Sequence, residues 1–183
     1  THWGIEADLT RLDGEYDLNF LAETEGQAYV LKVMRPGCEA EFVALQCGAF
    51  GHISASAPDV PVPNIVNTPS GENYIEVSDE AGDMRLVWLL EKCEGRVYAE
   101  TLPKTLALVA EVGAKLGAMD LALADFTHPA LARDFKWNLM QAGWIRDALD
   151  AITQPARHAL LGGILAEYEA LLPVLTALPQ VAI

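Results

Sequence analysis

A lysine inside an apolar stretch is the residue whose type and position most directly suggest chemistry. Lys32 lies in the run YVLKV at 29–33, and because side chains alternate along a strand, it shares a face with Val30. A charged amine on an apolar face is costly unless it has a partner. Two interpretations stay open, an edge-strand lysine whose amine reaches solvent and an amine held in place for a function.

Two acidic residues follow in a segment predicted to be helical. Cys38–Phe50 carries apolar residues at spacings of three and four, and Gly51 is predicted to end the helix. Glu41 lies four residues before a leucine, on the side that can face a sheet, and Glu39 is the less favoured alternative. Kinases use a helix glutamate to hold a strand lysine that binds ATP phosphates. A lone glutamate there is more often a solvated residue of the first helical turn.

The segments around the lysine predict an antiparallel sheet with that one helix. Glu25-Gly26 is a short turn typical of a hairpin, and the apolar run at 84–90 is typical of a strand buried on both faces. The predicted strands are 19–24, 27–33, 65–66, 73–77 and 84–90.

Beyond Glu94 the pattern is helical to the end of the sequence, so the fold class is α+β with a hinge-like junction at 91–96. The first helix is expected to have Pro103 in its first turn and an apolar face formed by Leu106, Val109, Gly113 and Leu116. The three predicted helices are Pro103–Leu123, Trp137–Ile152 and Ala156–Leu172, the last ending near Pro173.

Composition excludes some functions. The 183 residues carry a net charge of −14, which argues against a nucleic-acid binder but not against ATP, which needs only a local basic spot and a metal ion. No apolar run approaches the ~18 residues of a membrane span, and the N-terminal residues show no signal-peptide pattern. The three cysteines form no CxxC and predict reduced thiols in a cytoplasmic protein.

Taken in order, the motifs resemble the front part of the aminoglycoside phosphotransferase and choline kinase superfamily. The resemblance is strongest to the hydroxylysine-kinase-like branch, which also occurs as the front domain of fused class III aminotransferases. The segments that carry it are LDGEYDLNFLAETEGQAYVLKV, EAEFVALQ, PDVPVP, MRLVWLLE, EGR and FTHPAL followed by FKWNL.

This resemblance implies a protein-kinase-like N-lobe at 1–93 and the first helices of a truncated helical C-lobe at 94–183. It implies transfer of a phosphoryl group from ATP, with Mg²⁺, to a hydroxyl of a small amine or amino acid. Lys32 would bind the α- and β-phosphates, and Glu41 would orient it.

Two further ATP-binding segments follow from the resemblance. Leu12–Phe20 would cover the phosphates, and because Gly14 is its single glycine, contacts would rest on backbone N–H groups near Tyr16 to Asn19. Glu91, Lys92 and Cys93 would form the hinge whose main chain binds adenine; an ordinary strand-to-helix connection is the alternative.

Other candidate residues have structural explanations beside the functional one. Asp120 either touches substrate or is a solvated carboxylate. Trp137 and Trp144 are seven residues apart, and core packing is favoured over a wall of the substrate cleft. His128 is a possible general base, but in FTHPAL a helix-capping role is favoured.

The residues that would do the chemistry are missing from the pattern. The family uses an H-x-D-x-x-x-x-N loop and a later aspartate, for the substrate proton and for Mg²⁺, and no such loop occurs here. The segment 178–183 resembles the strand that leads into that loop. We therefore expect this chain alone to be inactive, with the remaining C-lobe of the same polypeptide as its partner. A non-catalytic kinase-like binding or regulatory module, or a purely structural interaction domain, are the alternatives.

Overall fold

The computed structural model describes residues 2–134, 137–179 and 181–182. The chain divides into two compact units, an N-terminal unit that runs to Leu131 and a C-terminal unit at Ala132–Val181. The lobe boundary at 93/94, which rests on the resemblance, remains a prediction. The segment 178–183, predicted to be a strand, includes Gln180 and Ile183, and the FKWNL motif includes Phe135 and Lys136; these four residues lie outside the described ones.

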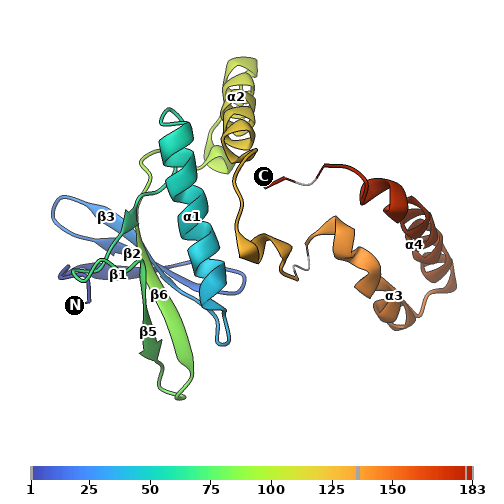
Figure 1. Cartoon of the computed structure of the whole chain (residues 1–183), viewed down its shortest axis with the longest axis horizontal. Coiled ribbons are helices and arrows are strands. Elements are labelled where there is room, and N and C mark those ends of the chain that lie inside the picture. The colour runs from blue at the N-terminus through green and yellow to red at the C-terminus, as the bar shows by residue number, and fades with distance from the viewer. Residues whose placement is uncertain (1, 135–136, 180, 183) are drawn as a thin grey trace. The chain divides into compact units, whose positions relative to one another are not determined.

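An antiparallel sheet forms the frame of the N-terminal unit (Figure 1). Its strand order is β1-β2-β3-β6-β4, and β5 also pairs with β6. The five predicted strands are confirmed, while β1 was missed because each of its residues is exposed and shows no apolar alternation. The strands are β1 Asp8–Leu12, β2 Leu18–Glu23, β3 Ala28–Val33, β4 Ile65–Val66, β5 Tyr74–Ser78 and β6 Met84–Glu91.

Helix α1, Ala40–Ser56, lies against one face of this sheet (Figure 1). The predicted end at Gly51 is wrong, since the helix continues and the Ala57 N–H caps it by donating to the Ile53 carbonyl at 2.8 Å. A helical glycine costs roughly 1 kcal/mol. The extra turn buries Ile53 against Val60 and Leu123, which offsets that cost.

The main core lies between α1 and the sheet. Trp88 is 0% exposed, stacks on Phe50 with ring centroids 6.4 Å apart, and donates its indole N–H to the Met34 sulfur at 3.3 Å. All residues from Leu86 to Leu90 are buried, so the prediction of a β6 strand covered on both faces is confirmed. The Trp88 side chain is therefore held in one position in the core between α1 and the sheet.

The reactivity of the Cys47 thiol provides a test of this core. Burial raises the pKa of the Cys47 thiol to about 11, whereas Cys93 is exposed. At pH 8 we expect a thiol reagent to modify Cys93 rapidly and Cys47 only on unfolding, as mass spectrometry of labelled peptides can measure. Because the pKa of Cys47 in the folded chain is above the ordinary thiol value of 9.0, its contribution to stability should fall as pH rises from 9.0 to about 11. Equal labelling rates for the two thiols would contradict this.

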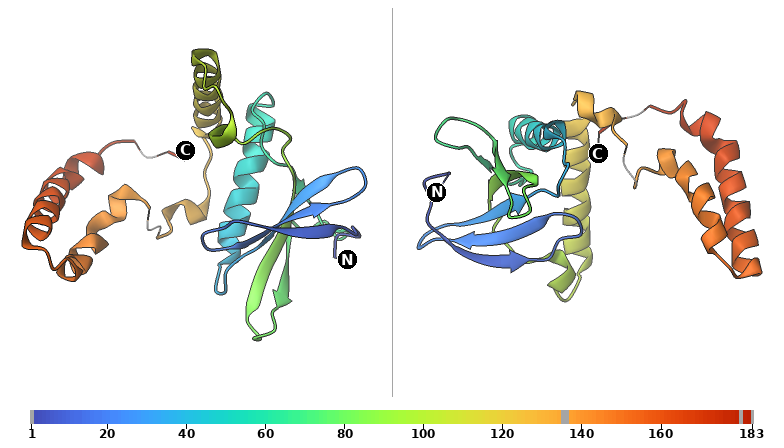
Figure 2. Two further views of the ribbon diagram at one scale, coloured as in Figure 1. Left: turned by 180° about the vertical axis from the view of Figure 1, so that it is seen from behind. Right: turned by 90° about the horizontal axis from the view of Figure 1, so that it is seen from below.

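Helix α2, Leu106–Leu123, packs its C-terminal end beside α1 (Figure 2). Pro103 is not in its first turn as predicted, because Thr105 is the N-cap and its side chain accepts the Leu108 N–H at 3.1 Å. The predicted apolar face of α2 is exposed to solvent, including Leu106 and Leu116. Two short 3-10 helices, Tyr98–Glu100 and Pro129–Ala132, flank α2.

The C-terminal unit is helical, but its first predicted helix is broken. In place of one helix over 137–152 the chain forms 3-10 helix η3 Leu139–Trp144, α3 Ile145–Ala148 and 3-10 helix η4 Leu149–Ala151. Asn138 starts this series by accepting the Met140 N–H at 3.0 Å. An N-cap at Asn138 places the start of the helical series after Trp137, so the predicted start at Trp137 is wrong.

Helix α4, Pro155–Leu175, ends two residues past Pro173, so the predicted end near that proline is confirmed. The Thr176 hydroxyl donates to the Leu172 carbonyl at 2.9 Å, and the Thr176 N–H donates to the same carbonyl. The last turn thus has donors although Pro173 supplies none. Arg146 holds this helix to α3, its Nε donating to Glu169 at 2.9 Å.

By length and composition α4 is one helix in the described chain that could cross a membrane, contrary to the sequence expectation. Only Leu165 of this helix is buried. Glu167 and Glu169 lie within it, and a carboxylate in hydrocarbon is costly. These carboxylates favour packing of α4 against protein over a position in a membrane.

Candidate functional site

Lys32 lies in a row of residues that crosses the sheet. Strand pairing sets it opposite Asn19 of β2 on one side and opposite Trp88 of β6 on the other. Directly paired residues point to the same face of a sheet, so these three side chains lie together. The half-buried Lys32 therefore projects on the face that carries the buried Trp88.

The contacts of Lys32 are with uncharged groups. Its ammonium donates to the Asn19 side-chain oxygen at 2.9 Å and lies 6.0 Å from the centroid of the Trp88 ring. An ammonium is attracted to an aromatic face at about this distance. Sequence reasoning placed Asn19 near the phosphates only through its backbone, and missed this side-chain role.

A sequence signal for this pair does exist. Glu25-Gly26 joins β2 and β3, and the Thr24 N–H donates to the Gln27 carbonyl across the turn at 2.9 Å. A two-residue turn sets the register of its hairpin. Counting back from it puts Asn19 opposite Lys32.

The predicted ion pair between Lys32 and Glu41 is absent. Within the described residues no carboxylate lies within 4.0 Å of the Lys32 ammonium. Glu39, the N-cap of α1, and Glu41, in its first turn, are both exposed. The helix residues that pack on the sheet are apolar, among them Val43. The register between β2 and β3 places the Asn19 side chain beside Lys32 as a hydrogen-bond acceptor. The side of α1 that faces the sheet carries apolar residues. The site is a half-buried positive charge without an anionic partner.

The loop between β1 and β2 is anchored beside this lysine. Asp17 accepts the Arg35 N–H at 2.9 Å, and the Arg35 guanidinium lies 5.7 Å from the exposed Tyr16 ring. A side-chain carbon added at Gly14 would lie 2.4 Å from the Asp17 carbonyl oxygen and 2.6 Å from the Asn19 amide nitrogen. Glycine is therefore required there by close packing. Phosphate contacts from the backbone of Tyr16 to Asn19 remain a prediction.

The predicted hinge is a connection anchored at its first two residues. The Glu91 N–H donates to the Asn64 carbonyl at 2.9 Å, and the Lys92 N–H donates to the Ala28 carbonyl at 3.0 Å. The Glu91 carboxylate accepts from the side chains of Gln27 at 3.2 Å and Asn64 at 2.8 Å. In an antiparallel ladder this pattern turns the Glu91 carbonyl away from β3.

Cys93 is exposed, and in the described part of the chain its backbone N–H has no hydrogen-bond partner. The geometry leaves a carbonyl at Glu91 and an N–H at Cys93 for an external ring. That these groups bind adenine stays a prediction.

The remaining candidates do not join this site. Asp120 is exposed on α2. Trp137 and Trp144 are 62% and 45% exposed, so the favoured core-packing interpretation is wrong; their helix is broken and does not bury them. His128 accepts the Ala130 N–H on its ring nitrogen at 3.2 Å, which confirms the capping role.

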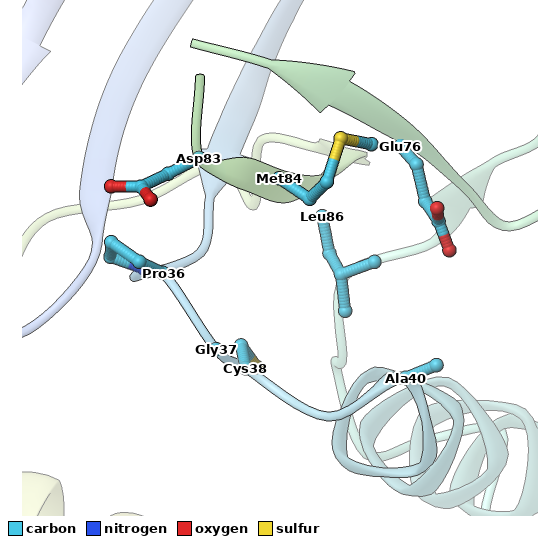
Figure 3. Close-up of a pocket in the computed structure, with 8 residues that line it drawn as sticks. All are labelled: Pro36, Gly37, Cys38, Ala40, Glu76, Asp83, Met84 and Leu86. Carbon is cyan, nitrogen blue, oxygen red and sulfur yellow. The ribbon is translucent and has the colours of Figure 1, made fainter. Parts of the chain in front are cut away.

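The cavity drawn in Figure 3 lies away from Lys32. Its volume is about 250 Å³, and it opens between the segment before α1 and the β5–β6 hairpin. Exposed Glu76 and Asp83 lie at opposite ends of it in Figure 3. The acids do not converge, so we place the chemistry at the sheet row with Lys32 and not in this cavity. The lining residues are Pro36, Gly37, Cys38, Ala40, Glu76, Asp83, Met84 and Leu86.

Comparisons with known proteins identify relatives of the fold. Residues 8–183 match the profile of the phosphotransferase enzyme family. A microcompartment-associated aminopropanol kinase is 22% identical with a TM-score of 0.59, over 75% of this chain and 42% of that one. An amicoumacin kinase solved with AMP-PNP, Ca²⁺ and Ami is 18% identical with a TM-score of 0.67, over 94% of this chain and 49% of that one.

Sequence comparison with curated proteins gives no match. The two solved structures confirm the α+β kinase-like fold, and this chain spans less than half of the length of either. The hydroxylysine-kinase-like branch and the aminotransferase fusion remain predictions from the resemblance.

Proposed function

The chain belongs to the phosphotransferase enzyme family, and from this premise we propose that it is the nucleotide-binding part of an ATP-dependent kinase of small molecules. The observation that carries the proposal is the charge state of the site. Lys32 presents a half-buried ammonium that is held by neutral groups and lacks a carboxylate among the described residues.

An unneutralised charge in a half-buried place is costly, and an anion that binds there recovers the cost. The chain carries a net charge of −14. A lysine on an apolar sheet face of such an acidic chain supports a site for an anionic ligand. A triphosphate supplies anionic oxygens of the kind that lysine ammoniums bind in phosphotransferases. Main-chain groups at Glu91 and Cys93 would take the adenine.

The described residues contain no group of three or more His, Cys, Asp or Glu side chains that could hold a metal ion. Mg²⁺, which would neutralise phosphate charge in such a reaction, needs one or two side-chain ligands beside the phosphates. We propose that its ligands and the catalytic carboxylate belong to a further part of the polypeptide.

We propose the remaining C-lobe as the partner of the exposed apolar helix faces. The solved relatives are more than twice as long as the part that this chain covers in them. Apolar residues exposed on α4 include Leu160, Ile164 and Leu171, and a large apolar surface of this kind is seldom left bare. The phosphate acceptor, a hydroxyl of a small amine or amino acid, would bind mostly in that C-lobe.

The missing catalytic motif favours one second candidate. No H-x-D-x-x-x-x-N pattern occurs between Thr1 and Ile183, which suits a non-catalytic kinase-like binding or regulatory module. Nucleotide binding is common to both proposals. It is absent from the alternative of a purely structural domain.

Calorimetry with ATP tests the proposed function. We expect weak binding by this chain, and Lys32→Met should lower the affinity about tenfold to a hundredfold, because it removes charge-assisted hydrogen bonds to phosphate. Lys115→Met is the control, because it makes the same change at a lysine outside the proposed site, whose ammonium donates to the Asp59 carbonyl at 2.7 Å. Mg²⁺ should change the affinity little.

An affinity that is unaffected by Lys32→Met would overturn the assigned role of the lysine. Strong Mg²⁺ dependence would show that metal ligands exist within this chain. Absence of any ATP binding would favour the structural domain.

A further inference from the structure

The side chain of Asn19 has a fixed orientation between Lys32 and the preceding loop. A lysine ammonium can only donate hydrogen bonds, so the amide oxygen of Asn19 must face it, as the 2.9 Å contact shows. The amide nitrogen then faces Gly14, where an added side-chain carbon would lie 2.6 Å from it. The Asn19 amide is thus confined on one side by Gly14 and on the other by Lys32.

Lys32 is confined as well. Its ammonium lies 6.0 Å from the centroid of the Trp88 ring, and that ring is buried and held by Phe50 and Met34. A long lysine side chain otherwise samples many rotamers, and the loss of that freedom on binding weakens a ligand. One amide and one ring together fix the place of the charge before any ligand arrives.

We propose that Asn19 is the positioning residue of Lys32. Its neutral amide oxygen holds the ammonium in place and leaves the positive charge available to a phosphate. This inference rests on the proposed function, and it replaces the role that the sequence had assigned to Glu41. A carboxylate at this position would hold the ammonium more strongly but would neutralise it and repel phosphate oxygens.

Three substitutions separate these effects. Asn19→Leu keeps the approximate size and removes the acceptor, while Asn19→Asp keeps the shape and the acceptor and adds a negative charge. Asn73→Asp adds the same charge at an exposed position and serves as the control. Circular dichroism checks that each variant is folded.

The first readout needs no nucleotide. The chain has only five lysines, so the ammonium signals in a ¹H–¹⁵N spectrum can be assigned. In Asn19→Leu we expect the Lys32 signal to broaden, because its protons exchange faster with water. The signals of Lys104 and Lys115, which donate to backbone carbonyls, should stay unchanged. In Asn19→Asp the Lys32 signal should persist.

The second readout is the affinity for ATP at low salt. We expect a three- to tenfold loss for Asn19→Leu, a larger loss for Asn19→Asp that shrinks as salt is added, and no change for Asn73→Asp. A merely structural role for Asn19 predicts the opposite order, with the isosteric Asp variant nearly unaffected.

An unchanged Lys32 signal in Asn19→Leu would overturn the proposal, as would wild-type ATP affinity in Asn19→Asp. If Asn19→Leu fails to fold, the folded Asp variant decides. If the wild-type chain binds no ATP, the proposed function fails, and the spectrum still decides whether Asn19 holds Lys32.

Discussion

Replacing Trp88 by alanine is expected to destabilise the N-terminal unit by about 3–5 kcal/mol, the range for deleting a large buried aromatic side chain. Trp88 is 0% exposed and contacts Phe50, Met34 and the Lys32 ammonium. Its removal would leave a cavity between α1 and the sheet. Urea unfolding followed by circular dichroism measures the free-energy change.

Trp137→Ala is the matched control. It makes the same chemical change at a side chain that is 62% exposed, so the expected effect is within about 0.5 kcal/mol of zero. Trp88→Phe should lie between the two, since it keeps an aromatic ring but loses the N–H bond to Met34. A loss below about 1 kcal/mol for Trp88→Ala would show that the core does not depend on this ring.

This chain alone is expected to transfer no phosphate above background. A parent polypeptide, meaning a longer chain that carries the proposed C-lobe, is expected to turn over at about 1–100 s⁻¹, the usual range for kinases. Positioning ATP does not suffice, because transfer also needs bridging metal ions and a carboxylate beside the attacking hydroxyl. The described residues contain no metal-binding cluster. Turnover of ATP with hydroxylated amines and amino acids, for this chain and for the parent polypeptide, measures the difference.

The control is Lys32→Met in the parent polypeptide, which should remove most of its turnover. Turnover by the short chain would contradict the proposal, above all if replacing one of its own acids lowered it; the acids to test are Asp120, Asp134, Asp147 and Asp150. An inactive parent that lacks an H-x-D-x-x-x-x-N loop would favour the non-catalytic module.

The sequence by itself determined five of the six strands, the antiparallel character of the sheet and the resemblance to the family. These features follow from local signals, namely the period-two alternation, the turn at Glu25-Gly26 and the apolar run of β6. The sequence also identified Lys32 as a candidate functional residue, because a charge within an apolar strand is costly without a partner. The two-residue turn also sets the register that pairs Lys32 with Asn19.

Tertiary structure alone decided that Glu41 is not the partner of Lys32. Glu41 has the spacing to face the sheet, but a helix can present any of its faces, and the packing of Val43 and Cys47 on the sheet sets which one. Glu41 stays exposed in the first turn, while Val43 of the same turn is buried. Helix rotation depends on contacts between residues distant in sequence, which periodicity does not specify.

The helix boundaries were decided in the same way. α1 passes Gly51 because Ile53 gains a buried place against α2, whereas α4 ends just past Pro173, where Thr176 donates to the Leu172 carbonyl. The weak local preference of glycine for a helix end is outweighed where packing contributes more. Local sequence therefore indicated where elements lie, and contacts formed only in the folded chain determined where they end and which side chains meet.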